Sequence, residues 1–208
     1  MKKSNLPIVY TPDNEPYFGR SLVFHLDQII VSTMDINKKA AKKSRKLHLS
    51  DHQKMASQII PQTLSIILSI RELIRQGYLF SGFVLLRAVV ERVAIILYLS
   101  IFPEKVNIWN NGWNQKEAPN LATMLDEIKL ISINGPEMKG KDYTAFMNSL
   151  VHGKPDSAFY SIVNTSSIEI GHSASKNLDR PDLCDDLCAD LISWIAVIQV
   201  MMIKYFIE

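Results

Sequence analysis

LLRAVVERVAIILY, residues 85–98, is the most apolar stretch of the chain that has helical spacing. Its length and the absence of an internal breaker predict a long buried helix over residues 79–102, which ends before Pro103. Three charged residues, Arg87, Glu91 and Arg92, interrupt the apolar pattern. A charge inside an apolar helix is costly unless it is paired or used, so these residues are the first candidates for function.

Arg87 and Glu91 are four residues apart, so a helix places them on the same side, and Tyr98 lies on that side too. Because Leu, Val, Ile and Ala occupy the other faces, we expect the pair to be at least half-buried. Two interpretations remain open. The pair either forms a structural ion pair that sets the helix register, or it forms the charged wall of a pocket in which Glu91 holds Arg87 ready for an anion.

Helical patterns flank this stretch on both sides. They predict helices from about Tyr17 to Arg45 and over residues 51–76, 121–133, 141–152 and 179–207, with a kink at Pro61 in the second of them. Residues 159–174 are predicted to be a loop or a small hairpin. The fold class is therefore all-α: an antiparallel helical bundle of about five to seven helices, with residues 79–102 and 179–207 at its centre.

Local signals support these helix ends. Ser50 and Asn120 are typical N-caps, Gly77 fits a C-cap, and Pro181 fits the first turn of the last helix. Residues 1–16 carry three prolines and are predicted to be an extended N-terminal arm. No repeat or low-complexity tract occurs, so residues 17–208 are predicted to form a single domain.

The composition and the absence of several known motifs limit the classes of function that this chain can have. The chain has 208 residues, 47% apolar residues and a net charge of +2, which is too small to indicate a nucleic-acid partner by total charge alone. No Walker loop, dinucleotide fingerprint or Gly-x-Ser-x-Gly elbow occurs, which argues against enzymes defined by those motifs. We expect no cofactor and no metal.

The expected compartment is the cytoplasm. Cys184 and Cys188 are four residues apart in a helical segment, a spacing that favours two packed, reduced thiols over a disulfide. No signal peptide follows Met1, and we expect no integral membrane segment, because charged or polar residues such as Gln199 and Lys204 interrupt the apolar stretches.

Charge is unevenly distributed. A basic run comprises Lys38, Lys39, Lys42, Lys43, Arg45 and Lys46, and it is either a solvated helix end or a patch that contacts phosphate. Acidic residues line the start of the last helix: Asp182, Asp185, Asp186 and Asp190. The helix dipole stabilises negative charge there, so this interpretation is favoured over a metal cluster.

The stretch AFMNSLVHG, residues 145–153, is the second candidate region. Lys141, Asn148 and His152 share one polar face of the predicted helix, with Ser149 beside it. Histidine is the side chain best suited to proton transfer near neutral pH, and Asn148 or Ser149 can orient its ring or hold a substrate oxygen. Alternatively, His152 only caps the last carbonyl groups of the helix.

MNSLVH, residues 147–152, resembles the Arg-Asn-x-x-x-His signature of the HEPN superfamily (higher eukaryotes and prokaryotes nucleotide-binding), and the resemblance covers roughly residues 60–155. It implies an all-α bundle that often dimerises and whose active members are metal-independent ribonucleases of toxin–antitoxin and antiviral defence systems. Asn148 and His152 match the signature. Met147 stands where the arginine is expected, and methionine cannot neutralise a phosphate.

The resemblance implies roles for the candidate residues. His152 would be the acid or base that activates a ribose 2′-hydroxyl, Arg87 would face the phosphate, Glu91 would orient Arg87, and Asn148 would position the substrate. Further predicted substrate-binding residues are Ser149, Lys141, Tyr98, Trp109 and Trp113. The two tryptophans belong to an aromatic and asparagine-rich segment that either stacks on bases or plugs the end of the bundle.

The predicted partners are RNA or a nucleotide, a second copy of the chain, and a protein such as an antitoxin or a toxin. Because Met147 stands at the arginine position of the signature, two functions remain open. The chain is either an RNA- or nucleotide-associated protein, which does or does not cleave RNA, or a non-enzymatic interaction module of the immunity or antitoxin type.

Overall fold

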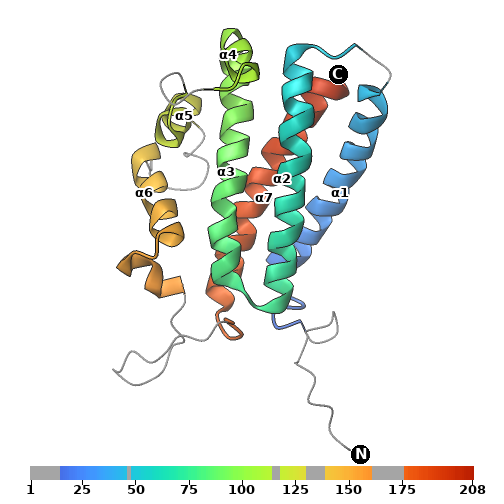
Figure 1. The fold of residues 1–208 in the computed structure, drawn as a ribbon. Helices are drawn as coiled ribbons and strands as arrows, with labels where there is room; N and C mark the ends of the chain where they lie inside the picture. The colour runs from blue at the N-terminus through green and yellow to red at the C-terminus, as the bar shows by residue number, and fades with distance from the viewer. Residues whose placement is uncertain (1–14, 46–47, 114–117, 130–138, 161–175) are drawn as a thin grey trace, which may run out of the picture.

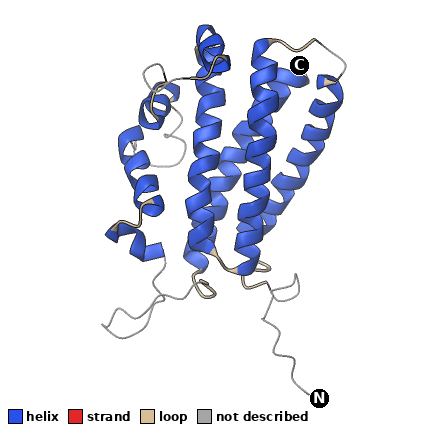
Figure 2. Cartoon of the chain, in the orientation of Figure 1, coloured by secondary structure: helices blue, strands red, loops and turns tan. Residues whose placement is uncertain are grey.

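The computed structural model describes residues 15–45, 48–113, 118–129, 139–160 and 176–208. These residues form α-helices and short 3-10 helices, and no strand occurs among them (Figure 1, Figure 2). In chain order the elements are α1 (Ser21–Ser44), α2 (Asp51–Gln76), α3 (Leu79–Ile101), η2 (Pro103–Lys105), α4 (Val106–Asn110), α5 (Leu121–Ile128), α6 (Gly140–Val151), η4 (Pro155–Tyr160) and α7 (Pro181–Phe206). The predicted all-α bundle is confirmed.

Four long helices, α1, α2, α3 and α7, form the main bundle. α7 packs against the other three, and α3 packs in addition against α5 and α6. Figure 1 shows α5 and α6 beside α3, on the side of the bundle away from α1. Most of the fully buried large side chains come from α2, α3 and α7, so α3 and α7 lie in the core as predicted.

α7 is also long and apolar enough to cross a membrane by length and composition, the one such helix among the described residues. Leu187, Leu191, Ile195 and Ile198 on this helix are completely buried against the rest of the bundle. The apolar composition of α7 therefore has a role in the core of the bundle.

The predicted caps hold the helix ends. The Ser50 side chain accepts a hydrogen bond from the backbone N–H of Gln53, and the Gln53 side chain accepts one from the backbone N–H of Ser50. Gly77 ends α2 with φ 79°, a left-handed conformation in which a Cβ is strained. Asn120 accepts a hydrogen bond from the first turn of α5.

Several boundaries differ from the predictions. α1 begins at Ser21 rather than near Tyr17, because a turn precedes it in which Gly19 has φ 84°. α5 ends at Ile128 rather than at residue 133, because Lys129 is left-handed with φ 53°. Residues 159–160 belong to η4, and the rest of the hairpin considered for residues 159–174 lies outside the described residues, as do residues 1–14 of the predicted arm.

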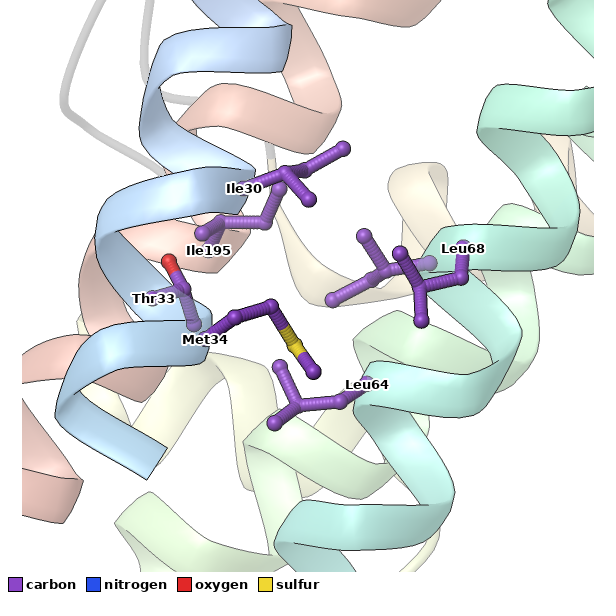
Figure 3. Close-up of a pocket in the computed structure, with 7 residues that line it drawn as sticks. Ile30, Thr33, Met34, Leu64, Leu68 and Ile195 are labelled. Carbon is purple, nitrogen blue, oxygen red and sulfur yellow. The ribbon is translucent and has the colours of Figure 1, made fainter. Parts of the chain in front are cut away.

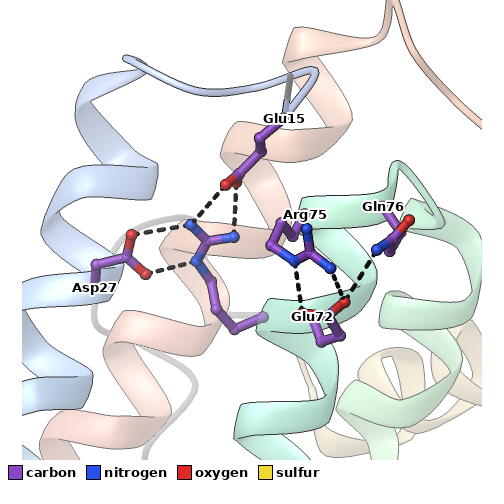
Figure 4. Close-up of polar contacts among 6 residues, drawn as sticks. Glu15, Asp27, Glu72, Arg75 and Gln76 are labelled. Atoms are coloured by element: carbon purple, nitrogen blue, oxygen red, sulfur yellow. Dashed lines mark hydrogen bonds and ion pairs between the residues drawn. The ribbon is translucent and has the colours of Figure 1, made fainter. Parts of the chain in front are cut away.

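Arg71 of α2 joins the N-terminal turn to α1 through the carboxylates of Glu15 and Asp27, which Figure 4 labels. Its guanidinium donates to Glu15 Oε1 at 2.7 Å and to Asp27 Oδ1 at 2.5 Å. Only 3% of the Glu15 side chain and 16% of the Arg71 side chain are exposed. Burial lowers the pKa of Arg71, but the hydrogen bonds to Asp27 and Glu15 leave it raised. The end of the predicted arm is thus held by a buried ion network.

A second set of contacts closes the same end of the bundle. The Tyr17 hydroxyl donates to the Asn177 carbonyl, and the Asn177 N–H donates to the Gly77 carbonyl at 2.8 Å. Burial raises the pKa of Tyr17 to about 12. The N-terminal turn, the α2–α3 turn and the segment before α7 are therefore joined by hydrogen bonds between residues far apart in sequence.

The middle of the interior between α1, α2 and α7 is tightly filled. Figure 3 shows Ile30 and Met34 of α1, Leu64 and Leu68 of α2 and Ile195 of α7 around a hollow of about 10 Å³. A volume of this size holds at most about one water molecule. This hollow is a packing imperfection of an apolar core rather than a ligand site.

Candidate functional site

Arg87 of α3 and Asn148 of α6 are joined by a hydrogen bond in which Nη1 of the arginine donates to the amide oxygen. Both side chains are half-buried, and α6 packs against α3. Two candidates from separate stretches of the sequence are therefore brought into direct contact. We call Arg87, Asn148 and His152 the α3–α6 polar site.

His152 is the residue that ends α6. Its backbone N–H donates to the Asn148 carbonyl at 3.0 Å, and Gly153 follows with φ 60°. The imidazole is exposed, and it makes no hydrogen bond to any of the described residues. One helical turn separates His152 from Asn148, so both lie on the same side of α6. The ring can reach solvent and a ligand, and it does not cap the carbonyl groups within the described part of the chain.

Met147 and Ser149 flank Asn148 but turn inward. Met147 is 0% exposed, so the position that carries the arginine in the HEPN signature belongs to the core here. Ser149 is also buried, and its hydroxyl donates to the Phe146 carbonyl at 2.7 Å. The predicted role of Ser149 in holding a substrate requires an exposed hydroxyl, and the Ser149 hydroxyl is buried.

Glu91 lies outside the site. It is exposed on α3, whereas we expected the Arg87–Glu91 pair to be at least half-buried. No ion pair joins the two side chains within the described residues. The partner of Arg87 is Asn148, from another helix, and the interpretation of Glu91 as the residue that orients Arg87 is not supported by these contacts.

Tyr98, Trp109 and Trp113 lie toward the other end of α3. Eleven residues separate Arg87 from Tyr98, which is about 16 Å along a helix. Tyr98 is buried, its ring centroid lies 6.2 Å from that of Trp113, and its hydroxyl accepts a hydrogen bond from Lys105, whose pKa this bond raises. Trp109 packs partly buried against the core. These contacts fit the interpretation in which the aromatic segment plugs the end of the bundle. They do not fit the one in which exposed rings stack on bases.

Lys141 is exposed in the first turn of α6. It is eleven residues before His152, which again corresponds to about 16 Å along a helix. Lys141 can therefore contact only a distant part of an extended ligand that binds at His152.

Sequence reasoning named Asp190 only as one of the acidic residues near the start of the last helix, and it did not predict the acidic and aromatic cluster that Asp190 forms where α6 and η4 face α7. Burial and the nearby charge of Asp186 raise the pKa of Asp190 to about 6. Burial and the charge of Asp190 also raise the pKa of Tyr143 on α6, and the Trp194 side chain opposes this shift. No ion pair of the described residues includes Asp190. The available signal was that Asp190 lies between Leu187 and Leu191 on the apolar side of α7.

We expect the Asp190→Asn variant to be more stable than the parent at pH 7. Folding raises the pKa of Asp190 from 3.8 to about 6, so the folded state binds the extra proton and loses stability as pH rises from about 4 through about 6. Asparagine removes this loss, which is about 3 kcal/mol at pH 7. The measurement is urea unfolding of both proteins at pH 4.5 and pH 7.

Asp182→Asn is the control of opposite sign. Arg180 lowers the pKa of the Asp182 carboxyl, so this group stabilises the fold above its unfolded pKa and loses that contribution on acidification. The control variant should therefore be less stable than the parent at pH 7. Equal pH dependence in the parent and Asp190→Asn would contradict the assignment of a raised pKa to Asp190.

The predicted basic run lies on α1, across the bundle from α6 (Figure 1). Lys38 pairs with Asp35 at 3.0 Å, and Lys43 donates to the Ile207 carbonyl at the end of α7 at 2.6 Å. The other described members, Lys39, Lys42 and Arg45, are exposed, and Lys46 lies outside the described residues. The run is therefore no part of the α3–α6 polar site.

Cys184 and Cys188 are free thiols in the core, as predicted. A hydrogen bond with Cys188, together with burial, raises the pKa of Cys184. Within the described ranges, no group of three or more His, Cys, Asp or Glu side chains is arranged to hold a metal ion. No protein-family model, curated protein or solved structure matches this chain.

Proposed function

We propose that this chain is a cytoplasmic, HEPN-like protein that binds RNA or a nucleotide, in a defence or toxin–antitoxin setting, through the α3–α6 polar site. One observation carries the proposal: Arg87 contacts Asn148 across two helices, and the exposed imidazole of His152 lies one turn beyond on the same side of α6. The all-helical fold agrees with what the sequence resemblance implies.

The chemistry of these residues suits a phosphodiester. A guanidinium has five N–H donors, and the bond to Asn148 uses one of them, which leaves donors for phosphate oxygens. Asn148 accepts from Arg87 and so restricts its orientation. Histidine is a side chain that commonly acts as a general base, and deprotonation of a ribose 2′-hydroxyl requires such a base. Attack of that oxygen on the phosphorus would break the bond to the 5′-oxygen of the next nucleotide, which leaves and takes up a proton, and the product would be a 2′,3′-cyclic phosphate formed without a metal.

The core position of Met147 favours binding over cleavage. The motif arginine of the HEPN signature is replaced by a side chain that cannot leave the core without loss of packing. Arg87 is then the one guanidinium at the α3–α6 polar site as we define it. We therefore propose binding as the principal property and treat cleavage at His152 as a separate question.

The test of binding is the fluorescence anisotropy of a labelled single-stranded RNA titrated with the protein. Arg87→Ala is expected to weaken binding about tenfold or more, because a hydrogen bond to a charged phosphate is lost. Arg75→Ala, which removes an arginine paired with Glu72 on α2, is the matched control and should bind like the parent. Equal affinities of Arg87→Ala and the parent, or no binding by the parent, would refute the proposal.

Cleavage is tested by incubating the same RNA with the parent and with His152→Ala in the presence of EDTA. Cleavage that requires His152 and leaves cyclic phosphate ends would assign the protein to the metal-independent ribonucleases. Intact RNA in both reactions, with binding retained, would assign it to the non-cleaving relatives.

The second candidate function is a non-enzymatic immunity or antitoxin-type interaction module. It is favoured by the exposure of Phe24 (59%) and Val31 (63%), which are seven residues apart and lie on one side of α1. An apolar side of a helix that faces solvent suits a protein partner, including the second copy of the chain that we predict. Light scattering of the parent and of a Phe24→Lys, Val31→Lys variant tests self-association, and an unchanged mass would argue against this surface as a contact between copies.

A further inference from the structure

The outer side of α1 carries exposed apolar side chains in its first half and exposed basic side chains in its second half. Phe24 and Val31 are seven residues apart, and Lys38, Lys42 and Arg45 follow on the same side of the helix. Neither Lys42 nor Arg45 makes an ion pair with any of the described residues. Figure 1 shows α1 at one edge of the bundle, on the side away from α5 and α6. A partner can therefore approach this side of α1.

α7 runs beside α1 in the same direction, and contacts at both ends fix how the two helices are aligned. Arg20, just before α1, pairs with Asp185 near the start of α7, 165 positions later. Lys43, near the end of α1, donates to the carbonyl of Ile207, 164 positions later. A residue of α1 therefore lies level with the residue of α7 that is 164 or 165 positions after it, and the two helices form a common face.

The middle of this face is apolar. By that alignment Ala196 of α7 lies level with Val31, and Val200 lies one turn further toward the end of α7. Ala196 is exposed, and 57% of Val200 is exposed. Together with Phe24 these residues form an apolar area over two adjacent helices, and exposed apolar areas of this kind mark interaction sites more often than single exposed residues do.

The start of α7 makes one end of the same face acidic. Residues 179–190 contain five Asp and one Arg. Burial and the like charges of Asp182 and Asp185 raise the pKa of Asp186, so these carboxylates repel one another. The basic half of α1 lies at the other end, beside the last turn of α7. The face thus has an acidic end, an apolar middle and a basic end.

A second copy turned end for end brings the basic end of one face onto the acidic end of the other. With Val31 at the twofold axis, a residue after Val31 lies level with the residue equally far before it in the second copy. Lys42 follows Val31 by eleven residues, and the residue eleven before Val31 pairs with Asp185. Lys42 thus lies level with Asp185 of the second copy, and Arg45 lies level with Asp182. A carboxylate has about four acceptor sites, so each can bind a second cation beside its own arginine.

The size of the face fits a contact between two bundles. α1 has 24 residues. This is about 36 Å of helix, and two adjacent helices are about 20 Å wide. The face therefore covers about 700 Å² per copy, close to the roughly 800 Å² per partner that a stable contact between proteins buries.

We propose that this α1–α7 face joins two copies of the chain, which pack antiparallel about a twofold axis at Val31. Its central residues are Phe24, Val31, Ala196 and Val200. Lys42 and Arg45 of each copy pair with Asp185 and Asp182 of the other. The inference rests on the second candidate function and deepens it, because it names the partner of the exposed side of α1. α6 lies on the other side of the bundle (Figure 1), so the dimer leaves both α3–α6 polar sites open.

The first test is the molar mass in solution, measured by sedimentation equilibrium over a series of protein concentrations. The parent should form a dimer. Val31→Glu should weaken dimerisation about tenfold or more, because it places two carboxylates against each other in an apolar contact. Ile108→Glu is the matched control and should dimerise like the parent, since it makes the same change at an exposed position of α4, outside the face.

Arg45→Glu and Asp182→Lys test the charge pairs. Each change alone places like charges together at both ends of the dimer and should weaken it about fivefold or more. An equimolar mixture of the two variants restores opposite charges at both ends, so the mixed dimer should regain most of the parent affinity. Asp182 also pairs with Arg180, so thermal unfolding verifies that this variant folds.

Cross-linking tests the antiparallel arrangement. Cys184 and Cys188 are buried, so a cysteine introduced on α1 is the thiol that a mild oxidant reaches first. Val31→Cys should form a disulfide between the two copies, because the two side chains meet at the axis. Lys42→Cys should not, because 22 helical positions, or about 33 Å, separate the two introduced thiols.

Three results would overturn the proposal. The first is a parent that stays monomeric at every concentration, and the second is a dimer that Val31→Glu leaves as intact as Ile108→Glu does. The third is disulfide formation in Lys42→Cys as fast as in Val31→Cys, which would indicate parallel helices. None of these results affects the RNA-binding test, because Arg87→Ala alters the α3–α6 polar site on another side of the bundle.

Discussion

The Arg71→Ala variant is expected to lose about 3 to 5 kcal/mol of its free energy of unfolding. Arg71 is the cation that compensates the buried carboxylate of Glu15 and holds Asp27 of α1 (Figure 4). Its removal leaves the Glu15 carboxylate in a site with 3% exposure and without its partner. Urea unfolding followed by circular dichroism at pH 7 measures the loss.

Lys54→Ala on the same helix is the control, because Lys54 pairs with Asp51 at an exposed position at 2.9 Å. Exposed pairs of this kind contribute about 1 kcal/mol or less, so this variant should stay close to the parent. The double variant Arg71→Met, Glu15→Gln removes both charges and should recover part of the loss. A loss in Arg71→Ala no larger than that in Lys54→Ala would contradict a buried ion network.

The Met147→Arg variant, which restores the arginine of the HEPN signature, is expected to lose about 4 kcal/mol or more of stability and to gain no RNA affinity. Met147 is completely buried, whereas Asn148 beside it faces Arg87. An arginine at residue 147 would place an unpaired cation in the core between α6 and the rest of the bundle. Thermal unfolding and RNA anisotropy of the purified variant measure both effects.

Met147→Leu is the matched control, because it keeps the volume and apolar character of the side chain and should cost less than about 1.5 kcal/mol. A Met147→Arg protein that is as stable as the parent and binds RNA more tightly would show that residue 147 can turn toward the α3–α6 polar site. In that case the arginine introduced at residue 147, and not Arg87, would be the principal cation of the site.

The candidate site was only partly predictable. Arg87, Asn148 and His152 stand out in the sequence because each interrupts an apolar helical pattern or ends it. Helical spacing, however, relates only residues within one helix, and it suggested Glu91 as the partner of Arg87. The hydrogen bond to Asn148 depends on how α6 packs against α3, a contact between residues 61 positions apart. The burial of Asp190 was not predictable for the same reason, because it depends on how α6 and η4 pack against α7.

Local patterns alone predicted the all-α class, the caps at Ser50, Gly77 and Asn120, and the central position of the two most apolar helices. Each of these depends on backbone preferences or apolar periodicity over a few turns, which neighbouring residues encode. Packing between distant segments decided that the Glu15 carboxylate is buried against Arg71 and that Arg87 contacts Asn148. Burial and long-range hydrogen bonds exist only after the helices have assembled, so their energies cannot be assigned from the order of residues.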